Sequence, residues 1–199
     1  MSSHMICVRY FVENVMNHEW ITNHFVAICF LDRDGTINLN TGYPHRCEEL
    51  HILDHAAKGI HMLNQNRVLV VVVTNQSGIG RKYFGISDMQ QFHRCIEKEL
   101  AKEDAHIDLW RYCPHHPDDD CTCRKPKTGM VDDLVSCHPD SLFFVGDSKS
   151  DMQCAKNVGA VPLAIRGTPA SLESDVSIVS DLLDASKRII LSIKLNNQS

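Results

Sequence analysis

An apolar segment that ends in two aspartates constrains the fold of this chain more than any other feature. Residues 25–31 (FVAICFL) are apolar, and Asp32, Asp34, Gly35 and Thr36 follow within five positions. An apolar run of this length that stops at a turn is typical of a strand buried on both faces. Alternate residues of an extended chain point the same way, so Asp32 and Asp34 are expected to converge on one ligand just beyond the strand.

The chemistry of this aspartate pair points to a metal ion. Two carboxylates at such close range repel each other unless a cation or a shared proton lies between them. A ligand set made only of oxygen atoms suits Mg²⁺, and open α/β sheets bind their ligands beyond the carboxyl ends of the strands. An isolated Asp-x-Asp is more often a plain acidic turn. The longer string that ends in Gly35 and Thr36, placed after an apolar run, is a far more specific pattern than an isolated Asp-x-Asp.

Composition bounds the class of protein. The chain has 199 residues, of which 43% are apolar and 23% charged, which suits one domain with a sizeable core. A net charge of −5 argues against a nucleic acid or an anionic membrane as partner. No apolar run approaches the roughly 20 residues that a membrane span needs. We expect residues 25–195 to form a single domain and residues 1–24 an extension, in which residues 3–5 resemble the remnant of an affinity tag.

Cysteine usage points to the compartment. The chain has nine cysteines, an odd number, and their spacing is not that of a small secreted protein. We see no signal peptide. The sequence therefore predicts a reducing cytoplasm, in which some of the cysteines bind a metal.

Further strands are expected to bring polar groups to the same edge of the sheet. Residues 68–73 form a second apolar run, which stops at Thr74; a hydroxyl and free backbone N–H groups at such a point suit a phosphate. Residues 141–145 predict another strand, after which Asp147 and Asp151 stand four residues apart. Additional strands are expected at 107–112, 160–165 and 176–179, with a closing helix at 181–194. Alternating strands and helices predict an α/β fold with a parallel sheet covered on both faces.

A compact group of thiols and imidazoles predicts a second metal site. Cys113, His115, Cys121 and Cys123 fall within eleven residues. Three thiols and one imidazole make the closed, four-ligand set of a structural zinc site, which leaves no open position. His116 is an alternative ligand to His115 on the sequence alone. We therefore predict a zinc-stabilised loop.

Four motifs, taken in order, resemble a known superfamily. They are DRDGT at 32–36, TNQSG at 74–78, CRKP at 123–126 and GDSKSD at 146–151. Their order over residues 25–165 resembles the four signatures of the haloacid dehalogenase superfamily of phosphoryl-transfer enzymes. In that superfamily the second aspartate is typical of phosphatases. The short gaps between motifs leave no room for a cap domain, so we expect a Rossmann-like, capless fold with a small zinc-binding loop.

The resemblance implies roles for individual residues. Asp32 would attack phosphorus and form an aspartyl-phosphate, and Asp34 would carry the proton. Thr74 and Lys125 would stabilise the charge of the phosphoryl group. Mg²⁺ would bind Asp32, the backbone carbonyl of Asp34, and Asp147. Contacts with the substrate are implied for a flap and for residues near the second and third motifs: Asn40, Thr41, Gly42, Tyr43, Asn75, Gln76, Ser77 and Arg124.

Finer details resemble one branch of the superfamily. The strings DRDGTIN and CPHHP resemble the heptose bisphosphate phosphatases, whose nearest relatives, the histidinol-phosphate phosphatases, share the zinc loop. Ser77 favours the heptose branch, whereas Lys82 and Ser148 depart from its pattern. This branch implies a cytoplasmic monomer that acts on a small sugar bisphosphate in the synthesis of nucleotide-activated heptose for lipopolysaccharide. The alternatives are a phosphatase for histidinol phosphate or another small ester, a phosphotransferase, and a zinc-stabilised binding module without catalysis.

Overall fold

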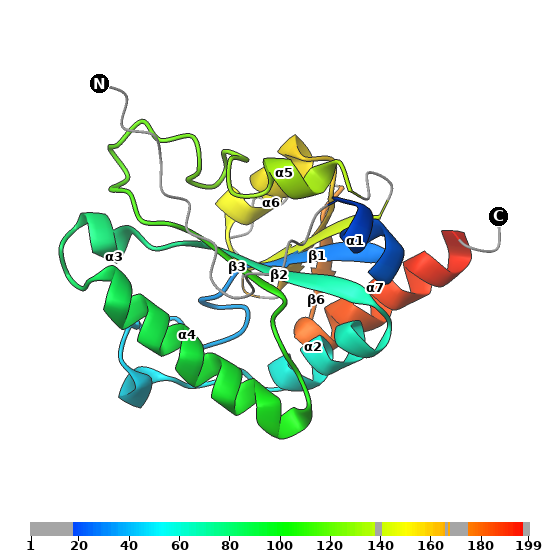
Figure 1. Cartoon of the computed structure of the whole chain (residues 1–199), viewed down its shortest axis with the longest axis horizontal. Helices are drawn as coiled ribbons and strands as arrows, with labels where there is room; N and C mark the ends of the chain where they lie inside the picture. Colours follow the sequence, from blue (N-terminus) through cyan, green and yellow to red (C-terminus); the bar gives the residue numbers. More distant parts are fainter. Residues whose placement is uncertain (1–17, 138–140, 166, 168–174, 197–199) are drawn as a thin grey trace.

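Six parallel strands form the central sheet of the molecule (Figure 1). The computed structural model describes residues 18–137, 141–165, 167 and 175–196. In these ranges the strands are β1 (Ala27–Leu31), β2 (Val68–Asn75), β3 (Leu109–Cys113), β4 (Leu142–Gly146), β5 (Val161–Ile165) and β6 (Ser177–Val179). Their order across the sheet is β3-β2-β1-β4-β5-β6. The strand that precedes the aspartate pair therefore lies in the middle, between β2 and β4.

Helices cover both faces of this sheet. The helical segments are α1 (His18–His24), η1 (Cys47–Glu49), α2 (Ala56–Gln65), α3 (Ser77–Gly80), α4 (Ile86–Leu100), η2 (Ala101–Glu103), α5 (Asp132–Val135), α6 (Lys149–Asn157) and α7 (Leu182–Asn196). Figure 1 shows α2, α4 and α7 on one face and α1, α5 and α6 on the other. The parallel sheet with helices on both faces, predicted from the alternation of strands and helices, is confirmed.

Two apolar cores follow from the alternation of side chains along the strands. Cys29 and Leu31 of β1 belong to the core under α2, α4 and α7, to which Ile60, Phe92 and Ile189 contribute. The intervening residues of β1 belong to the opposite core, together with side chains from α1, α5 and α6; members of this second core include Ile21, Ile28, Phe30, Leu134 and Ala155. Because β1 is buried on both faces, its sequence is a continuous apolar run.

The first described residues pack against this fold. Residues 18–24 form helix α1, whose Ile21 is buried in the second core. Arg67 donates from Nε to the carbonyl of His24 and from Nη2 to that of Asn23, which caps the end of the helix. The domain boundary predicted at residue 25 stays a prediction, and residues 1–17 lie outside the described part of the chain. None of the helices in the described ranges is long and apolar enough to cross a membrane.

Candidate active site

The carboxyl ends of β1, β2 and β4 place the predicted site residues at one edge of the sheet. Asp32 follows β1 directly, and its N–H still pairs with the carbonyl of Val145 at 2.9 Å. Asp147 follows β4 and approaches the turn at Gly35 so closely that a Cβ atom on Gly35 would lie 1.9 Å from its Oδ2. Gly35 also has a φ of +89°, which disfavours other residues. Gly35 is thus required in the first motif, because Asp147 of the fourth motif lies too close to leave space for a side chain there.

Lys125 joins two of the carboxylates. Its Nζ lies 2.6 Å from Oδ1 of Asp32 and 2.6 Å from Oδ1 of Asp151, and all three side chains are nearly fully buried. Its ammonium group also donates to the carbonyl of Val73. Burial alone would lower the pKa of Lys125, but the neighbouring Asp151 and Asp32 raise it above its usual range. The ammonium group is therefore a fixed positive charge at the edge of the sheet.

Three carboxylates gather beside this lysine. Asp32, Asp147 and Asp151 each offer an oxygen atom, and these atoms lie within 4.8 Å of one another. Burial raises the pKa of Asp32 to about 8 despite Lys125, and it raises the pKa of Asp147 to about 6, with Asp151 adding to both shifts. A divalent cation would stabilise the charged form of these buried carboxylates and so displace the protons. The donor set of oxygen atoms fits Mg²⁺ better than a softer metal.

Asp151 enters this group because α6 begins just before it. Ser148 is the N-cap of α6, and its hydroxyl donates to Oδ2 of Asp151 at 2.6 Å, while its backbone N–H bonds the same oxygen at 3.0 Å. A Cβ atom on Gly146 would lie 2.5 Å from that oxygen. The helix therefore starts early enough to turn Asp151 toward Asp147. The four-residue spacing of Asp147 and Asp151 predicts a shared helix face but gives Asp151 no role by itself.

The carboxylate of Asp34 lies outside the three-carboxylate group. Its two oxygens accept from Nε and Nη2 of Arg33 at 2.9 and 2.8 Å. Asn38 and Gln76 donate to it as well, at 2.9 and 3.1 Å. Gln76 donates also to the hydroxyl of Thr74 at 2.8 Å, so the end of the second motif contacts the end of the first. A role for the backbone carbonyl of Asp34 as a metal ligand stays a prediction.

The predicted thiol and imidazole ligands converge in the loop after β3. Ligand atoms of Cys113, His115, Cys121 and Cys123 lie within 4.8 Å of one another. The sulfur atoms of Cys113 and Cys121 are 3.7 Å apart, and Nδ1 of His115 is 3.5 Å from that of Cys113. Zn–S bonds of about 2.3 Å in a tetrahedron require sulfur atoms about 3.8 Å apart. The cluster can therefore hold a tetrahedral metal ion.

The surroundings of this cluster favour metal binding. A hydrogen bond with the thiol of Cys123, opposed by burial, lowers the pKa of Cys113 to about 5, so a thiolate forms readily. His116 turns its Nδ1 toward the backbone of Asp118 instead, at 3.3 Å, which leaves His115 as the histidine of the group. The loop packs tightly on α3, because a Cβ atom on Gly80 would lie 2.4 Å from the backbone nitrogen of His116.

Comparison with known proteins agrees with this geometry. The family model described as polynucleotide kinase 3 phosphatase matches residues 27–177. A protein of Photorhabdus laumondii, named D-glycero-beta-D-manno-heptose-1,7-bisphosphate 7-phosphatase, is 35% identical over 82% of this chain and 95% of its own length. A D-glycero-alpha-D-manno-heptose-1,7-bisphosphate 7-phosphatase of Mycobacterium tuberculosis is 35% identical over 85% of this chain and 86% of its own.

A solved structure extends this similarity to three dimensions. The D,D-heptose 1,7-bisphosphate phosphatase from B. bronchiseptica, crystallised with magnesium and phosphate, has a TM-score of 0.76 and 30% identity, covering 83% of this chain and 99% of that one. This chain belongs to the heptose 1,7-bisphosphate 7-phosphatase family. It is a phosphatase of the haloacid dehalogenase type, which confirms the enzyme class predicted from the order of the motifs.

The predicted substrate contacts fall into two groups. The flap residues Asn40, Thr41, Gly42 and Tyr43 are exposed, and the ring of Tyr43 packs edge-on against that of Tyr83. Arg124 is half-buried, whereas Gln76 and Ser77 are buried. The structure thus leaves the flap open to solvent, whereas Gln76 is held against Asp34 and Thr74.

Asn75 has a partner within the protein. Its side-chain amide accepts from the N–H of Lys125 at 3.0 Å and donates to the carbonyl of Lys125 at 3.2 Å. This two-way contact fixes the segment that carries Lys125 to the end of β2. In this structure the side chain of Asn75 positions the lysine, and its predicted contact with substrate stays a prediction.

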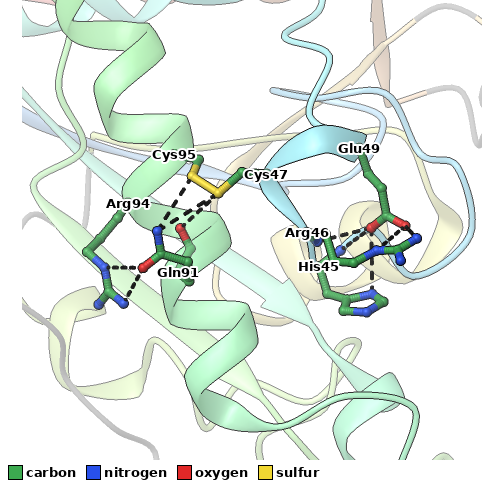
Figure 2. The surroundings of a disulfide bond; sticks show 7 residues. All are labelled: His45, Arg46, Cys47, Glu49, Gln91, Arg94 and Cys95. Carbon is green, nitrogen blue, oxygen red and sulfur yellow. Dashed lines mark hydrogen bonds and ion pairs between the residues drawn. A yellow bond between two sulfur atoms is a disulfide. The ribbon is translucent and has the colours of Figure 1, made fainter.

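A disulfide lies beside the flap. Figure 2 shows Cys47 of η1 bonded to Cys95 of α4. The prediction that the cysteines are reduced is therefore wrong for this pair, because the fold brings two cysteines that are far apart in the sequence within bonding distance. The same figure shows Glu49 accepting from the backbone N–H groups of His45 and Arg46, both at 3.0 Å. Together these contacts fasten the end of the flap to α4.

Proposed function

We propose that this enzyme removes the 7-phosphate of D-glycero-D-manno-heptose 1,7-bisphosphate through an aspartyl-phosphate on Asp32. The observation that supports the chemistry is the buried Asp32 at the end of β1, paired with Lys125 and adjacent to Asp147 and Asp151. The substrate is proposed from the activities for which relatives that match most of the chain are named. The product would be a heptose 1-phosphate, which is the form that nucleotide activation for lipopolysaccharide synthesis requires.

The proposed reaction has two displacements. In the first, a carboxylate oxygen of Asp32 attacks phosphorus, the bond from phosphorus to the sugar oxygen breaks, and Asp34 gives that oxygen a proton. In the second, water attacks the same phosphorus and passes a proton to Asp34. The acyl-phosphate bond then breaks, which releases inorganic phosphate and restores the Asp32 carboxylate.

Fixed charges would stabilise the phosphoryl group during both displacements. Lys125 presents an ammonium group at the Asp32 carboxylate, and Thr74 presents a buried hydroxyl at the end of β2. Asp32, Asp147 and the carbonyl of Asp34 would hold Mg²⁺, with Asp151 beside them. Bound there, the ion would neutralise negative charge on the phosphoryl oxygens and on Asp32.

The Cys/His cluster has a structural role in this proposal. Zn²⁺ held by Cys113, His115, Cys121 and Cys123 would have no open position for a substrate. Arg124 and Lys125 follow Cys123 directly, and Lys127 donates to the carbonyl of Cys121 at 2.7 Å. The cluster would thus hold the backbone that presents Lys125 to Asp32 and Arg124 to the distal phosphate of the substrate.

The deciding experiment is release of phosphate in the presence of Mg²⁺. Both anomers of heptose 1,7-bisphosphate should be compared with histidinol phosphate, because the two named relatives differ in anomer. We expect kcat/KM to favour one bisphosphate anomer over histidinol phosphate by roughly 100-fold, equivalent to about 2.7 kcal/mol. Phosphorus NMR of the product should show that the phosphate at position 1 remains.

Each rival function has its own outcome. A preference for histidinol phosphate would overturn the substrate but leave the two-step chemistry. Transfer of phosphate to an added alcohol in place of water would identify a phosphotransferase. If protein that carries both metals hydrolyses none of these esters, the result would favour a binding module and overturn the proposal.

A further inference from the structure

Arg33 is the most deeply buried charged side chain in the described part of the chain. It stands between Asp32 and Asp34, and its side chain is fully buried. A buried guanidinium group is costly unless its N–H groups find partners. The hydrogen-bond partners of Arg33 therefore indicate its role.

The first partner is Asp34. Nε and Nη2 of Arg33 donate to the two carboxylate oxygens at 2.9 and 2.8 Å, which is the bidentate arrangement that fixes both position and orientation. Side chains of adjacent residues in a strand point to opposite faces, so this contact needs a turn. The turn is present, because the carbonyl of Arg33 accepts from the N–H groups of Ile37 and Asn38 at 2.9 and 3.1 Å.

The remaining N–H groups of Arg33 reach two other parts of the molecule. Nη2 also donates to the carbonyl of Pro44, at the end of the flap, at 3.0 Å. Nη1 lies 3.2 Å from Nε2 of His93 on α4. Arginine has no acceptor, so His93 must accept through Nε2 and be neutral. The guanidinium group also lies over the ring of Phe92, 4.8 Å from its centre.

The surroundings of His93 fit this uncharged role. Its ring stacks on Trp110, with centroids 4.0 Å apart, and it is buried. Burial, and then the adjacent Arg33, hold the pKa of His93 well below its usual range. One face of α4 thus supplies Phe92 and His93 as a rigid support for the guanidinium group.

We propose that Arg33 is the positioning residue for Asp34: its bidentate contact orients the carboxylate that carries the proton, and His93 and the flap at Pro44 hold Arg33 in place. This inference rests on the proposed function, because it needs Asp34 to protonate the leaving group. A positioning role for Arg33 differs from a merely structural role in one measurable way. Loss of Arg33 should slow only those substrates whose leaving group needs a proton.

The test compares two leaving groups in the Arg33→Lys variant. A sugar phosphate expels an alkoxide, which needs a proton, whereas 2,4-dinitrophenyl phosphate expels a stable phenolate. Positioned general acids contribute about 10²–10⁴-fold to a rate. We expect Arg33→Lys to slow the first displacement on the sugar phosphate roughly 100-fold, near the lower end of that range. The single-turnover burst from the dinitrophenyl ester should fall less than about threefold, because that step needs little protonation.

Controls separate this effect from misfolding. The ratio of the two rates does not depend on how much of a sample is folded. Arg111→Lys changes another buried arginine, on β3, which pairs with Asp133 at 2.9 Å, and it should leave the ratio unchanged. His93→Phe keeps the stacking on Trp110 but removes the Nε2 acceptor, and it should change the ratio in the same direction as Arg33→Lys, though less. Adding Arg33→Lys to Asp34→Asn should lower the rate on the sugar phosphate little further, because both substitutions act through the carboxyl group of Asp34.

The outcomes that overturn the inference differ from those that overturn the proposed function. Equal losses on both esters in Arg33→Lys, or an unchanged ratio while Asp34→Asn changes it, would reject Arg33 as the positioning residue. An Asp34→Asn variant with the wild-type ratio would instead reject the role of Asp34 in the proposed function. If heptose bisphosphate is not a substrate but another alkyl phosphate is, the ratio is measured with that ester.

Discussion

The two candidate metal sites of this enzyme are assembled in opposite ways. The Cys/His cluster takes its four side chains from one continuous segment, residues 113–123, which begins at the last residue of β3. The carboxylate centre takes Asp32 from the end of β1, and Asp147 and Asp151 from the end of β4 and the start of α6. The first is a closed set of four donors, whereas the second has three and leaves positions for water and substrate.

Because of this difference, the carboxylate centre should depend on the Cys/His loop, but the loop should not depend on the carboxylate centre. Lys125 reaches Asp32 from the segment that follows the Cys/His loop, and Asn75 fixes that segment to β2. Loss of the loop's structure should therefore disturb the carboxylate centre. Loss of the carboxylate centre should leave the loop intact, because no ligand of the Cys/His cluster depends on Asp32.

The largest expected effect comes from Asp32→Asn. Removing the nucleophile should lower kcat roughly 10⁴-fold or more, as losses of nucleophiles do in other hydrolases. The zinc content should stay at its wild-type value, because Asp32 is not a ligand of the Cys/His cluster. The protein should stay folded with a cooperative melting transition, because Asn nearly preserves the volume of Asp and Lys125 keeps its ion pair with Asp151. Phosphate release, metal analysis and calorimetry measure the three quantities.

A surface acid provides the matched control for that variant. Asp120→Asn changes an exposed carboxylate in the Cys/His loop, which pairs with Lys127 at 2.6 Å, and it should keep full activity. Substantial turnover by Asp32→Asn would remove Asp32 as nucleophile. A loss of zinc in Asp32→Asn would instead break the one-way dependence between the two regions.

The second effect, in order of size, comes from Cys121→Ser. Loss of a structural metal belongs to the changes that cost more than about 4 kcal/mol, which corresponds to roughly 8–16 °C in melting temperature for a domain of this size. Zinc content should fall, and kcat should fall with it because Lys125 is no longer held. Cys137→Ser is the control, since Cys137 is a buried cysteine outside the cluster. Full activity in zinc-free Cys121→Ser protein would show that the loop does not position Lys125.

The same contrast explains how much the sequence could predict. The three cysteines of the Cys/His set were predictable to the residue, because ligands close in sequence are also close in space, whereas the choice between His115 and His116 needed the structure. The carboxylate centre was predictable only in outline, from strand ends that share one edge of a parallel sheet. Asp151 acquires its place from the early start of α6 at Ser148, which the spacing alone left undecided.

Arg33 and the disulfide were missed for a related reason. Arg33 is a lone basic residue between two acids, and nothing in that string indicates that a turn folds its guanidinium group back onto Asp34. The available signal was its place two residues after a buried strand, where a charged side chain must find a partner. Cys47 and Cys95 are 48 residues apart, so their contact depends on how η1 meets α4.

The smallest expected effect concerns the pH dependence of metal binding. Burial raises the pKa of Asp32 to about 8 and that of Asp147 to about 6, so both hold protons in the metal-free folded protein at pH values where the unfolded chain has lost them. Their contribution to stability is therefore present below about pH 4 and is lost as the pH rises through 6 and 8. Mg²⁺ must displace these protons, and its affinity should rise about tenfold per pH unit between roughly 6 and 8.

Calorimetric titration of Mg²⁺ into magnesium-free, zinc-loaded protein at pH 6, 7 and 8 measures this dependence. The Cys/His cluster should behave differently in this zinc-loaded protein, because its thiols give up their protons when zinc binds and a metal-bound thiolate does not take a proton back in this range. Zinc content should therefore stay constant while Mg²⁺ affinity changes. A Mg²⁺ affinity that is equally flat from pH 6 to 8 would mean that Asp32 and Asp147 bind the ion without releasing protons, and the electrostatic contrast between the two regions would fail.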